Sequence, residues 1–192
     1  MSNTEEILVS SREQTARVTT KVLGYFRFTR RCKYIATEVG VYKSDILAIT
    51  PQNKLLEIEV KVSYNDFKND FKKSYKRYYT NFKKHEVYAN SANSKWRPNY
   101  FYYAVPESLV DKVVKYLKEN KINYGVISVV DGIPLPYNRE EWCSIVRKCK
   151  PLHKNNVSDS VINSIVGRMS SEVITRRQRI HMQIQKLKEK GD

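Results

Sequence analysis

Acidic and basic side chains that could do chemistry gather at the end of one short apolar segment, residues 54–62. Successive side chains of a β-strand point to opposite faces of a sheet. One face of this segment would therefore carry the aliphatic side chains of Leu56, Ile58 and Val60. The other face would carry the polar side chains of Glu57, Glu59 and Lys61. Two carboxylates and an ammonium group on a strand with an apolar opposite face are what a metal site on a core strand requires.

A third carboxylate, Asp45, begins another strand-like segment fourteen residues before Glu59. If the two strands pair, Asp45 reaches Glu59 at one edge of the sheet. Two carboxylates there suit Mg²⁺ or Mn²⁺, with water and a substrate phosphate as further ligands. Lys61 would lie beside the ion, where it could orient or deprotonate the attacking water, or stabilise charge on the phosphate. Glu38, on a neighbouring predicted strand, could supply a further ligand or a base, whereas Glu57 is expected to be a surface neighbour.

The segments that must position these residues alternate between strand and helix patterns. We expect strands at residues 33–39, 45–49, 55–61, 100–105 and 124–130. We expect helices at residues 4–24, 63–82, 107–120, 139–147 and 158–190, and a polar loop at residues 90–99. The first three strands have short connections, which imply an antiparallel meander. The later strands follow helices, which implies right-handed parallel crossovers and hence a mixed α/β sheet with helices on both faces.

The composition indicates which kind of protein this is and which kind of partner it would bind. The chain has 192 residues, enough for one domain with a helical appendage. Its 35 Lys and Arg exceed its 20 Asp and Glu, a net charge of +15 that favours a polyanionic partner. Three cysteines with no CxxC pair fit a reducing compartment. Neither a signal peptide nor an apolar stretch of membrane-spanning length is visible, so we expect a soluble, cytoplasmic protein with no membrane partner.

The pattern Asp45…Glu59-Val60-Lys61, between flanking helices, resembles the PD-(D/E)xK nuclease superfamily, with Ser44 at the position of the proline. Six ordered blocks narrow the resemblance to the MmcB-type DNA repair proteins and their phage relatives. These blocks are residues 44–48, 57–61, 63–72, 102–106, 124–128 and 146–150. The resemblance spans roughly residues 20–151, about two thirds of the chain, and the six blocks are more specific than the Glu-x-Lys tripeptide alone.

The resemblance implies a restriction-endonuclease-like fold, with a nuclease-like domain over residues 1–150 and a helical C-terminal extension over residues 151–192. It also implies a divalent-metal site made by Asp45, Glu59 and the carbonyl of Val60, with Lys61 catalytic. Glu38 corresponds to an acidic residue that many members carry upstream. Lys72, on the helix after the motif strand, would face the substrate.

Basic residues outside the motif suggest where nucleic acid would bind. Aromatic residues at helical spacing in residues 63–82 are expected to face the core, leaving basic residues to track phosphates or face solvent. These basic residues are Lys68, Lys72, Lys73, Lys76 and Arg77. Arg97 and Trp96, in the polar loop, could stack on a base, although Trp96 could equally anchor the loop to the core. The last helix has an apolar stripe among basic residues, so it could be a DNA-binding arm or a dimerisation helix.

The sequence therefore predicts a Mg²⁺- or Mn²⁺-dependent endodeoxyribonuclease acting in DNA repair, recombination or phage DNA processing. Duplex, branched and single-stranded DNA remain open as substrates, and so does RNA. One alternative is a non-catalytic DNA-binding module that retains the nuclease fold. Another is an assembly protein whose C-terminal helix makes the contacts. Clustered carboxylates argue against a pure binder, because they would repel phosphates without a cation between them.

Overall fold

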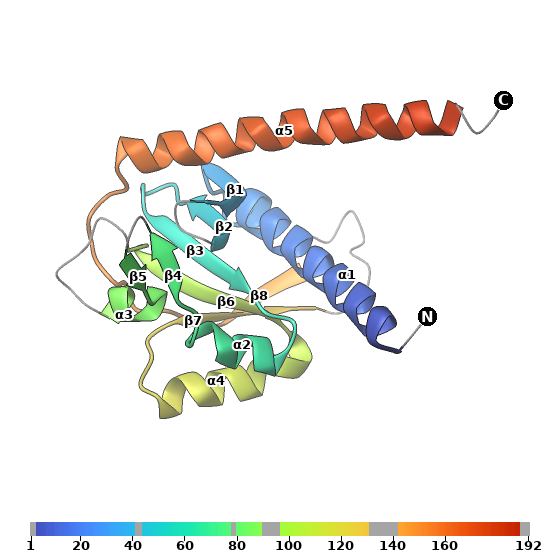
Figure 1. Ribbon diagram of the computed structural model, residues 1–192. Helices are drawn as coiled ribbons and strands as arrows, with labels where there is room; N and C mark the ends of the chain where they lie inside the picture. The colour runs from blue at the N-terminus through green and yellow to red at the C-terminus, as the bar shows by residue number, and fades with distance from the viewer. Residues whose placement is uncertain (1–2, 41–43, 78–79, 90–96, 131–141, 189–192) are drawn as a thin grey trace.

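The protein is built on one mixed β-sheet with helices on both faces (Figure 1). The computed structural model describes residues 3–40, 44–77, 80–89, 97–130 and 142–188, with the backbone alone for residues 3–10, 75–77 and 80–82. Six strands form the sheet in the order β1-β2-β3-β6-β7-β8. Their bounds are β1 Tyr34–Val39, β2 Ser44–Ile49, β3 Leu55–Val60, β6 Tyr100–Pro106, β7 Gly125–Val129 and β8 Cys143–Arg147.

The strand directions follow the lengths of the connections. Strands β1, β2 and β3 form an antiparallel meander, and the turn between β2 and β3 is closed by Thr50 N–H on Lys54 O at 2.9 Å. Strands β3, β6 and β7 are parallel, because helices intervene between them. β8 is antiparallel to β7. The expected mixed α/β sheet is therefore confirmed.

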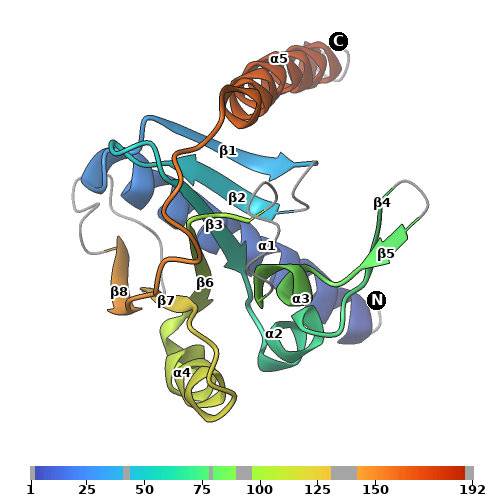
Figure 2. The same ribbon diagram turned by 90° about the vertical axis from the view of Figure 1, so that its left-hand side faces the viewer.

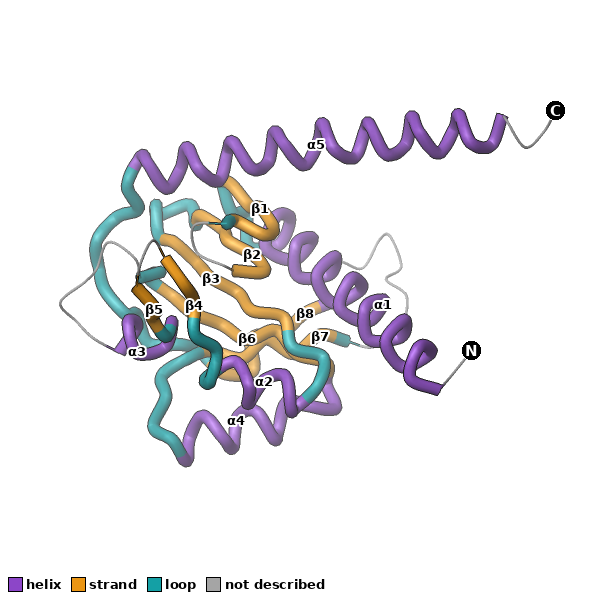
Figure 3. The backbone as a smooth tube through the Cα atoms, in the orientation of Figure 1, coloured by secondary structure: helices purple, strands orange, loops and turns teal. Residues whose placement is uncertain are grey.

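Different helices cover the two faces of the sheet (Figures 2 and 3). On one face, α1 (Asn3–Gly24) and the π-helical turn η1 (Tyr25–Thr29) pack on the aliphatic side of β3. The opposite face is covered near β6 and β7 by α2 (Tyr64–Asp70), α3 (Lys84–Ala89), η3 (Glu107–Leu109) and α4 (Val110–Glu119). The first part of α5 (Asp159–Lys188) lies on the same face over β1 and β2. None of the described helices has the length and apolar character that crossing a membrane requires.

Two predicted helices are wrong. The helix expected over residues 63–82 ends at Asp70, where Lys72 and Lys73 close a turn, and a hairpin follows with β4 (Tyr75–Arg77) and β5 (Thr80–Phe82). Tyr, Thr and Phe favour strands, so this segment satisfies a strand pattern as well as helical spacing. The sequence also predicts a helix over residues 139–147. Within that range, Cys143–Arg147 instead form the strand β8, which extends the sheet beside β7.

The C-terminal helix α5 has an anchored part and a projecting part (Figure 1). Ile165 is fully buried against Ala36, Val39 and Leu47 of β1 and β2. From about Val173 onward the helix is exposed, and it extends past the body of the protein. The helix predicted over residues 158–190 is thus found over Asp159–Lys188.

Candidate metal centre

The polar residues of β3 lie together on the buried face that α2 and α3 cover. Glu57 is fully buried, Glu59 is 3% exposed, and Lys61, directly after the strand, is also 3% exposed. Alternation along the strand places them opposite Leu56, Ile58 and Val60, which pack under α1. Glu57 is therefore not the surface neighbour that the sequence predicted.

Asp45 reaches the end of β3 from the neighbouring strand. Its Oδ2 accepts a hydrogen bond from Val60 N–H at 2.8 Å. The register of β2 and β3 places Asp45 opposite Glu59, and burial, with the Glu59 carboxylate next, raises the pKa of Asp45 to about 7. The C=O of a strand residue points to the same neighbour as its N–H, so the Val60 carbonyl also faces Asp45. The structure thus brings together the three groups predicted to hold a metal.

Lys61 links Glu59 to a second carboxylate on α2. Its Nζ lies 3.0 Å from Glu59 Oε2 and 3.0 Å from Asp70 Oδ1. Burial alone would lower the pKa of Lys61, but Glu59, Asp70 and Asp45 outweigh it and hold this pKa above its ordinary value. A lysine held protonated cannot take a proton from water. Of the roles predicted for Lys61, this arrangement therefore favours orientation and charge stabilisation.

A second lysine, Lys84 at the start of α3, binds the two glutamates of β3. Its Nζ lies 2.7 Å from Glu57 Oε1 and 2.5 Å from Glu59 Oε1. Burial would lower the pKa of Lys84, but the two carboxylates raise it overall. Tyr88 donates a hydrogen bond to the other oxygen of Glu57. Burial still raises the pKa of Glu57 above its ordinary value.

Asp70 is held in place by a shell of polar aromatic side chains. Its Oδ2 accepts a hydrogen bond from Tyr103 OH at 2.9 Å and lies 3.0 Å from His85 Nε2. The other His85 nitrogen lies 3.1 Å from Tyr124 OH. Burial would raise the pKa of Asp70, but the contacts with His85 and Lys61 hold it well below its ordinary value. Asp70 is therefore a fixed anion that positions Lys61.

The buried carboxyl groups of this cluster outnumber its buried ammonium groups, although Lys73 and His85 also contact Asp70. Its carboxyl groups are those of Asp45, Glu57, Glu59 and Asp70, and its buried ammonium groups are those of Lys61 and Lys84. Among the described residues, no group of three His, Cys, Asp or Glu side chains is arranged around a metal position. A pair of carboxylates with one backbone carbonyl still fits Mg²⁺, which keeps several waters and takes substrate phosphate as a ligand. Burial first, and the Glu59 carboxylate beside them, raise the pKa values of Asp45 and Glu57, and a divalent cation at this place would favour their ionised forms.

Glu38 does not join the cluster. The register of β1 and β2 places it opposite Asp45, but its backbone is left-handed, with φ of 51°. Its side chain is 80% exposed and pairs with Arg168 of α5 at 3.0 Å. The conformation of one residue thus turns the carboxylate away from the site that the sequence predicted for it.

The predicted nucleic-acid-binding residues have different surroundings. Lys72 is exposed, Lys73 approaches Asp66 and Asp70 at 3.5 and 3.6 Å, and Lys68 lies over the ring of Tyr64. Lys76 and Arg77 belong to β4, where only the backbone is described. Trp96 lies outside the described residues. Arg97 is only 7% exposed, so it does not present its side chain to a ligand at the surface as predicted.

Sequence reasoning missed Asp70, Lys84 and His85 as members of the cluster. Asp70 lies inside the block of residues 63–72, but nothing in its spacing connects it to Lys61. Lys84 follows a run of basic residues, which suggested a surface that faces solvent or phosphate. The turn after Asp70 and the β4–β5 hairpin return the chain to β3, and no local pattern predicted that return.

The comparisons with known proteins inform the fold alone. The chain matches no family model and no curated protein. A solved structure, "SPO1766 protein of unknown function from Silicibacter pomeroyi", resembles it with a TM-score of 0.52 and 13% sequence identity. The match covers 87% of this chain and 90% of that one, so the likeness extends over nearly the whole architecture.

Proposed function

We propose that this protein is a Mg²⁺- or Mn²⁺-dependent nuclease that hydrolyses phosphodiester bonds in DNA. The observation that supports this most strongly is the buried carboxyl group of Asp45, which makes no ion pair among the described residues and lies beside Glu59 and the protonated Lys61. A network of purely structural ion pairs has no need of Asp45, a carboxylate without an ammonium partner. A site for a divalent cation does need it.

In the proposed site, Asp45, Glu59 and the Val60 carbonyl would hold the metal, which supplies a Lewis acid and an acidified water when bound. Lys61 lies on the same face as Glu59 and would stabilise the charge that develops on the phosphate. Asp70, held by His85 and Tyr103, would keep the Lys61 ammonium group in that position. Lys84 would keep the Glu59 carboxylate in a fixed orientation.

DNA as the substrate is supported by the net charge of +15, because a basic surface gains affinity by releasing counterions from phosphates. Repair, recombination or phage DNA processing is the setting that the resemblance in the motif blocks suggests. A cytoplasmic location fits Cys32, Cys143 and Cys149, all of which are free thiols in the structure.

The test is a cleavage assay with Mg²⁺ or Mn²⁺ on duplex, single-stranded and branched DNA. We expect Asp45→Ala and Lys61→Ala each to lower the cleavage rate at least about a hundredfold, because each removes a group used in the transition state. Glu119→Gln is the matched control, since it removes an exposed carboxylate of α4 outside the cluster, and it should leave the rate unchanged. Cleavage that survives both cluster substitutions would exclude this site.

A non-catalytic DNA-binding module is the second candidate, and one observation favours it. Both oxygens of Glu59 already contact ammonium groups, those of Lys61 and Lys84. If these ion pairs leave Glu59 without an oxygen that can bind a metal, calorimetry should detect no Mn²⁺ binding to the wild-type protein. Binding of Mn²⁺ that Asp45→Asn abolishes would instead favour the nuclease.

A further inference from the structure

The last part of α5 is a basic helix that extends away from the body of the protein. We call residues 173–188 the basic arm. It carries five cations, Arg176, Arg177, Arg179, Lys186 and Lys188, and no Asp or Glu. Every residue of the arm is exposed. In Figure 1 the arm extends beyond the edge of the body.

The base of the arm is fixed one strand away from the metal centre. Arg168 donates to Thr37 O at 2.9 Å and pairs with Glu38 at 3.0 Å. Glu172 accepts hydrogen bonds from the backbone N–H and the hydroxyl of Thr37. Because Glu38 lies opposite Asp45 and paired strands lie about 4.8 Å apart, these contacts tie the arm to the strand beside the site.

The direction of α5 is fixed as well. Near its start, Val157 N–H donates to Asn53 O in the turn that precedes β3. Farther along, Arg168 reaches Glu38 at the opposite end of the β1–β2 pair. The helix therefore runs from the start of β3 toward the end that carries Glu59, and the arm leaves the protein on the side of the metal centre.

A hollow of about 340 Å³ at the base of the arm has the chemistry of a phosphate site. Its walls include Thr37, Glu38, Arg168, Glu172, Thr175, Arg176 and Arg179. The two carboxylates are already bound, by Arg168 and Thr37. Among the described residues, Arg176 and Arg179 make no ion pair. The guanidinium groups of Arg176 and Arg179, beside the hydroxyl of Thr175, suit a phosphodiester oxygen.

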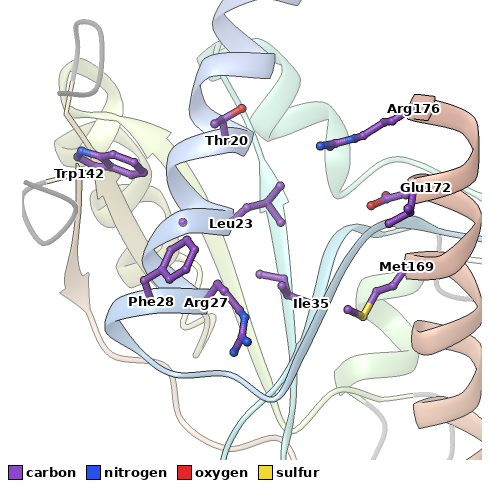
Figure 4. A pocket seen from close by; sticks show the side chains of 11 residues that line it. Thr20, Leu23, Arg27, Phe28, Ile35, Trp142, Met169, Glu172 and Arg176 are labelled. Atoms are coloured by element: carbon purple, nitrogen blue, oxygen red, sulfur yellow. The ribbon is translucent and has the colours of Figure 1, made fainter. Parts of the chain in front are cut away.

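Arg176 also borders a second, more apolar groove between α1 and α5 (Figure 4). Leu23, Ile35 and Met169 line this groove. In the figure, the guanidinium group of Arg176 points away from α5 toward the α1 side, beyond Glu172. This side chain is thus directed out from the helix rather than folded along it.

We propose that the basic arm binds the sugar-phosphate backbone of the DNA whose scissile phosphate lies at Asp45 and Glu59, with Arg176 and Arg179 holding one phosphate. This inference rests on the proposed function for the position of the scissile phosphate. From Arg176 to Lys188 the arm is about 18 Å long at 1.5 Å per residue, which corresponds to roughly five base pairs of duplex. The DNA would therefore extend from the metal centre along the arm.

A second copy of the chain is the main rival occupant. Val173, Ile180 and Leu187 recur at heptad spacing and are 56%, 55% and 71% exposed, a pattern that could pair helices. Pairing two arms, however, would bring together the five cations of each copy without one acidic residue to compensate them. Phosphates supply that compensation, and this charge argument favours DNA.

The experiment measures binding of a labelled 20-base-pair duplex by fluorescence anisotropy, in EDTA, over a series of salt concentrations. The arm variant is Arg176→Gln with Arg179→Gln. The matched control is Lys112→Gln with Lys118→Gln, which removes two exposed cations from α4, on the part of the protein farthest from α5 (Figure 1). We expect the arm variant to bind at least about tenfold more weakly and to lower the slope of log K against log salt by about two. The control should change affinity less than twofold.

Equal losses in the two variants, no loss in the arm variant, or no DNA binding by the wild type would each overturn the inference. The inference would also be overturned if sedimentation showed that the wild type is a dimer and that the arm variant is a monomer. Hydrolysis of bis(p-nitrophenyl) phosphate with Mn²⁺ tests the metal centre separately, because this small diester does not reach the arm. Arm-dependent DNA binding without any hydrolysis would support the inference while contradicting the proposed nuclease.

Discussion

Glu59 and Asp45 have different surroundings within the same cluster. Each oxygen of Glu59 has an ammonium partner, from Lys61 or Lys84. Asp45 accepts a hydrogen bond from the Val60 N–H, lies beside the Glu59 carboxylate and, among the described residues, makes no ion pair. Asp45 is therefore the position at which the network is open to a cation, whereas Glu59 is already neutralised. This difference is what the proposed metal site requires, because a closed set of salt bridges would leave no carboxylate open to a cation.

The pH dependence of stability tests the state of Asp45. The pKa of this carboxyl is about 7 in the folded protein and 3.8 in an ordinary environment. The stability that goes with the protonated form is complete below pH 3.8 and is lost as the pH rises to 7. We expect metal-free Asp45→Asn, which keeps an acceptor for Val60 N–H, to exceed the wild type at pH 8 by up to about 4 kcal/mol in free energy of unfolding.

Chemical denaturation at pH 4 and pH 8 measures this difference. Glu38→Gln is the control, and it should change stability little at either pH. Mn²⁺ at pH 8 should stabilise the wild type and leave Asp45→Asn unaffected. Equal stability of wild type and Asp45→Asn at pH 8 without metal would contradict the proposed charge excess.

Lys84 provides a second test at this scale, because it neutralises two buried carboxylates. We expect Lys84→Met to lower the free energy of unfolding by about 3–5 kcal/mol, since it leaves Glu57 without a cation. Adding Glu57→Gln removes the orphaned charge and should restore part of that loss. Urea titration of the two single variants and the double variant gives the coupling energy. Additive effects would show that Lys84 and Glu57 do not interact.

At the scale of elements, the sequence predicted the sheet better than the helices around it. The meander and the parallel crossovers follow from connection lengths and apolar runs, which are local properties. The helix expected over residues 63–82 failed because Tyr75–Arg77 and Thr80–Phe82 fit two periodicities, and tertiary pairing decided between them. The Asp45–Glu59 pair was predictable from the motif. The Asp70–Lys61 contact was not, because the turn after α2 and the packing on Tyr103 create it.

The anchoring of α5 is testable through two adjacent residues. Ile165 is fully buried against β1 and β2, whereas Val166 is 38% exposed. We expect Ile165→Ala to cost about 2–4 kcal/mol through lost contacts and a cavity. Val166→Ala should stay within about 0.5 kcal/mol. Thermal unfolding of both variants makes the comparison, and equal shifts would mean that α5 is not packed as described.

For the whole molecule, the free thiols report on the packing of the sheet. Burial raises the pKa of Cys32 to about 11 and that of Cys143 to about 12, and it also raises the pKa of Cys149. Because the thiolate is the reactive form, all three should label slowly with iodoacetamide at pH 8 in the native protein and rapidly in urea. Mass spectrometry over time measures this. Rapid native labelling of Cys32 or Cys143 would contradict the described core.

The length of α5 has a mechanical consequence. A continuous helix of 30 residues is about 45 Å long, and this one is clamped at Ile165 and Arg168 while its far end is unsupported. The helix therefore behaves mechanically as a lever that pivots where Ile165 and Arg168 attach it to β1. Any load on the tip exerts a torque that the Arg168–Glu38 and Glu172–Thr37 contacts must resist, on the strand that runs beside Asp45. Tension along DNA bound as proposed would thus act first on β1, the edge strand beside the strand that carries Asp45.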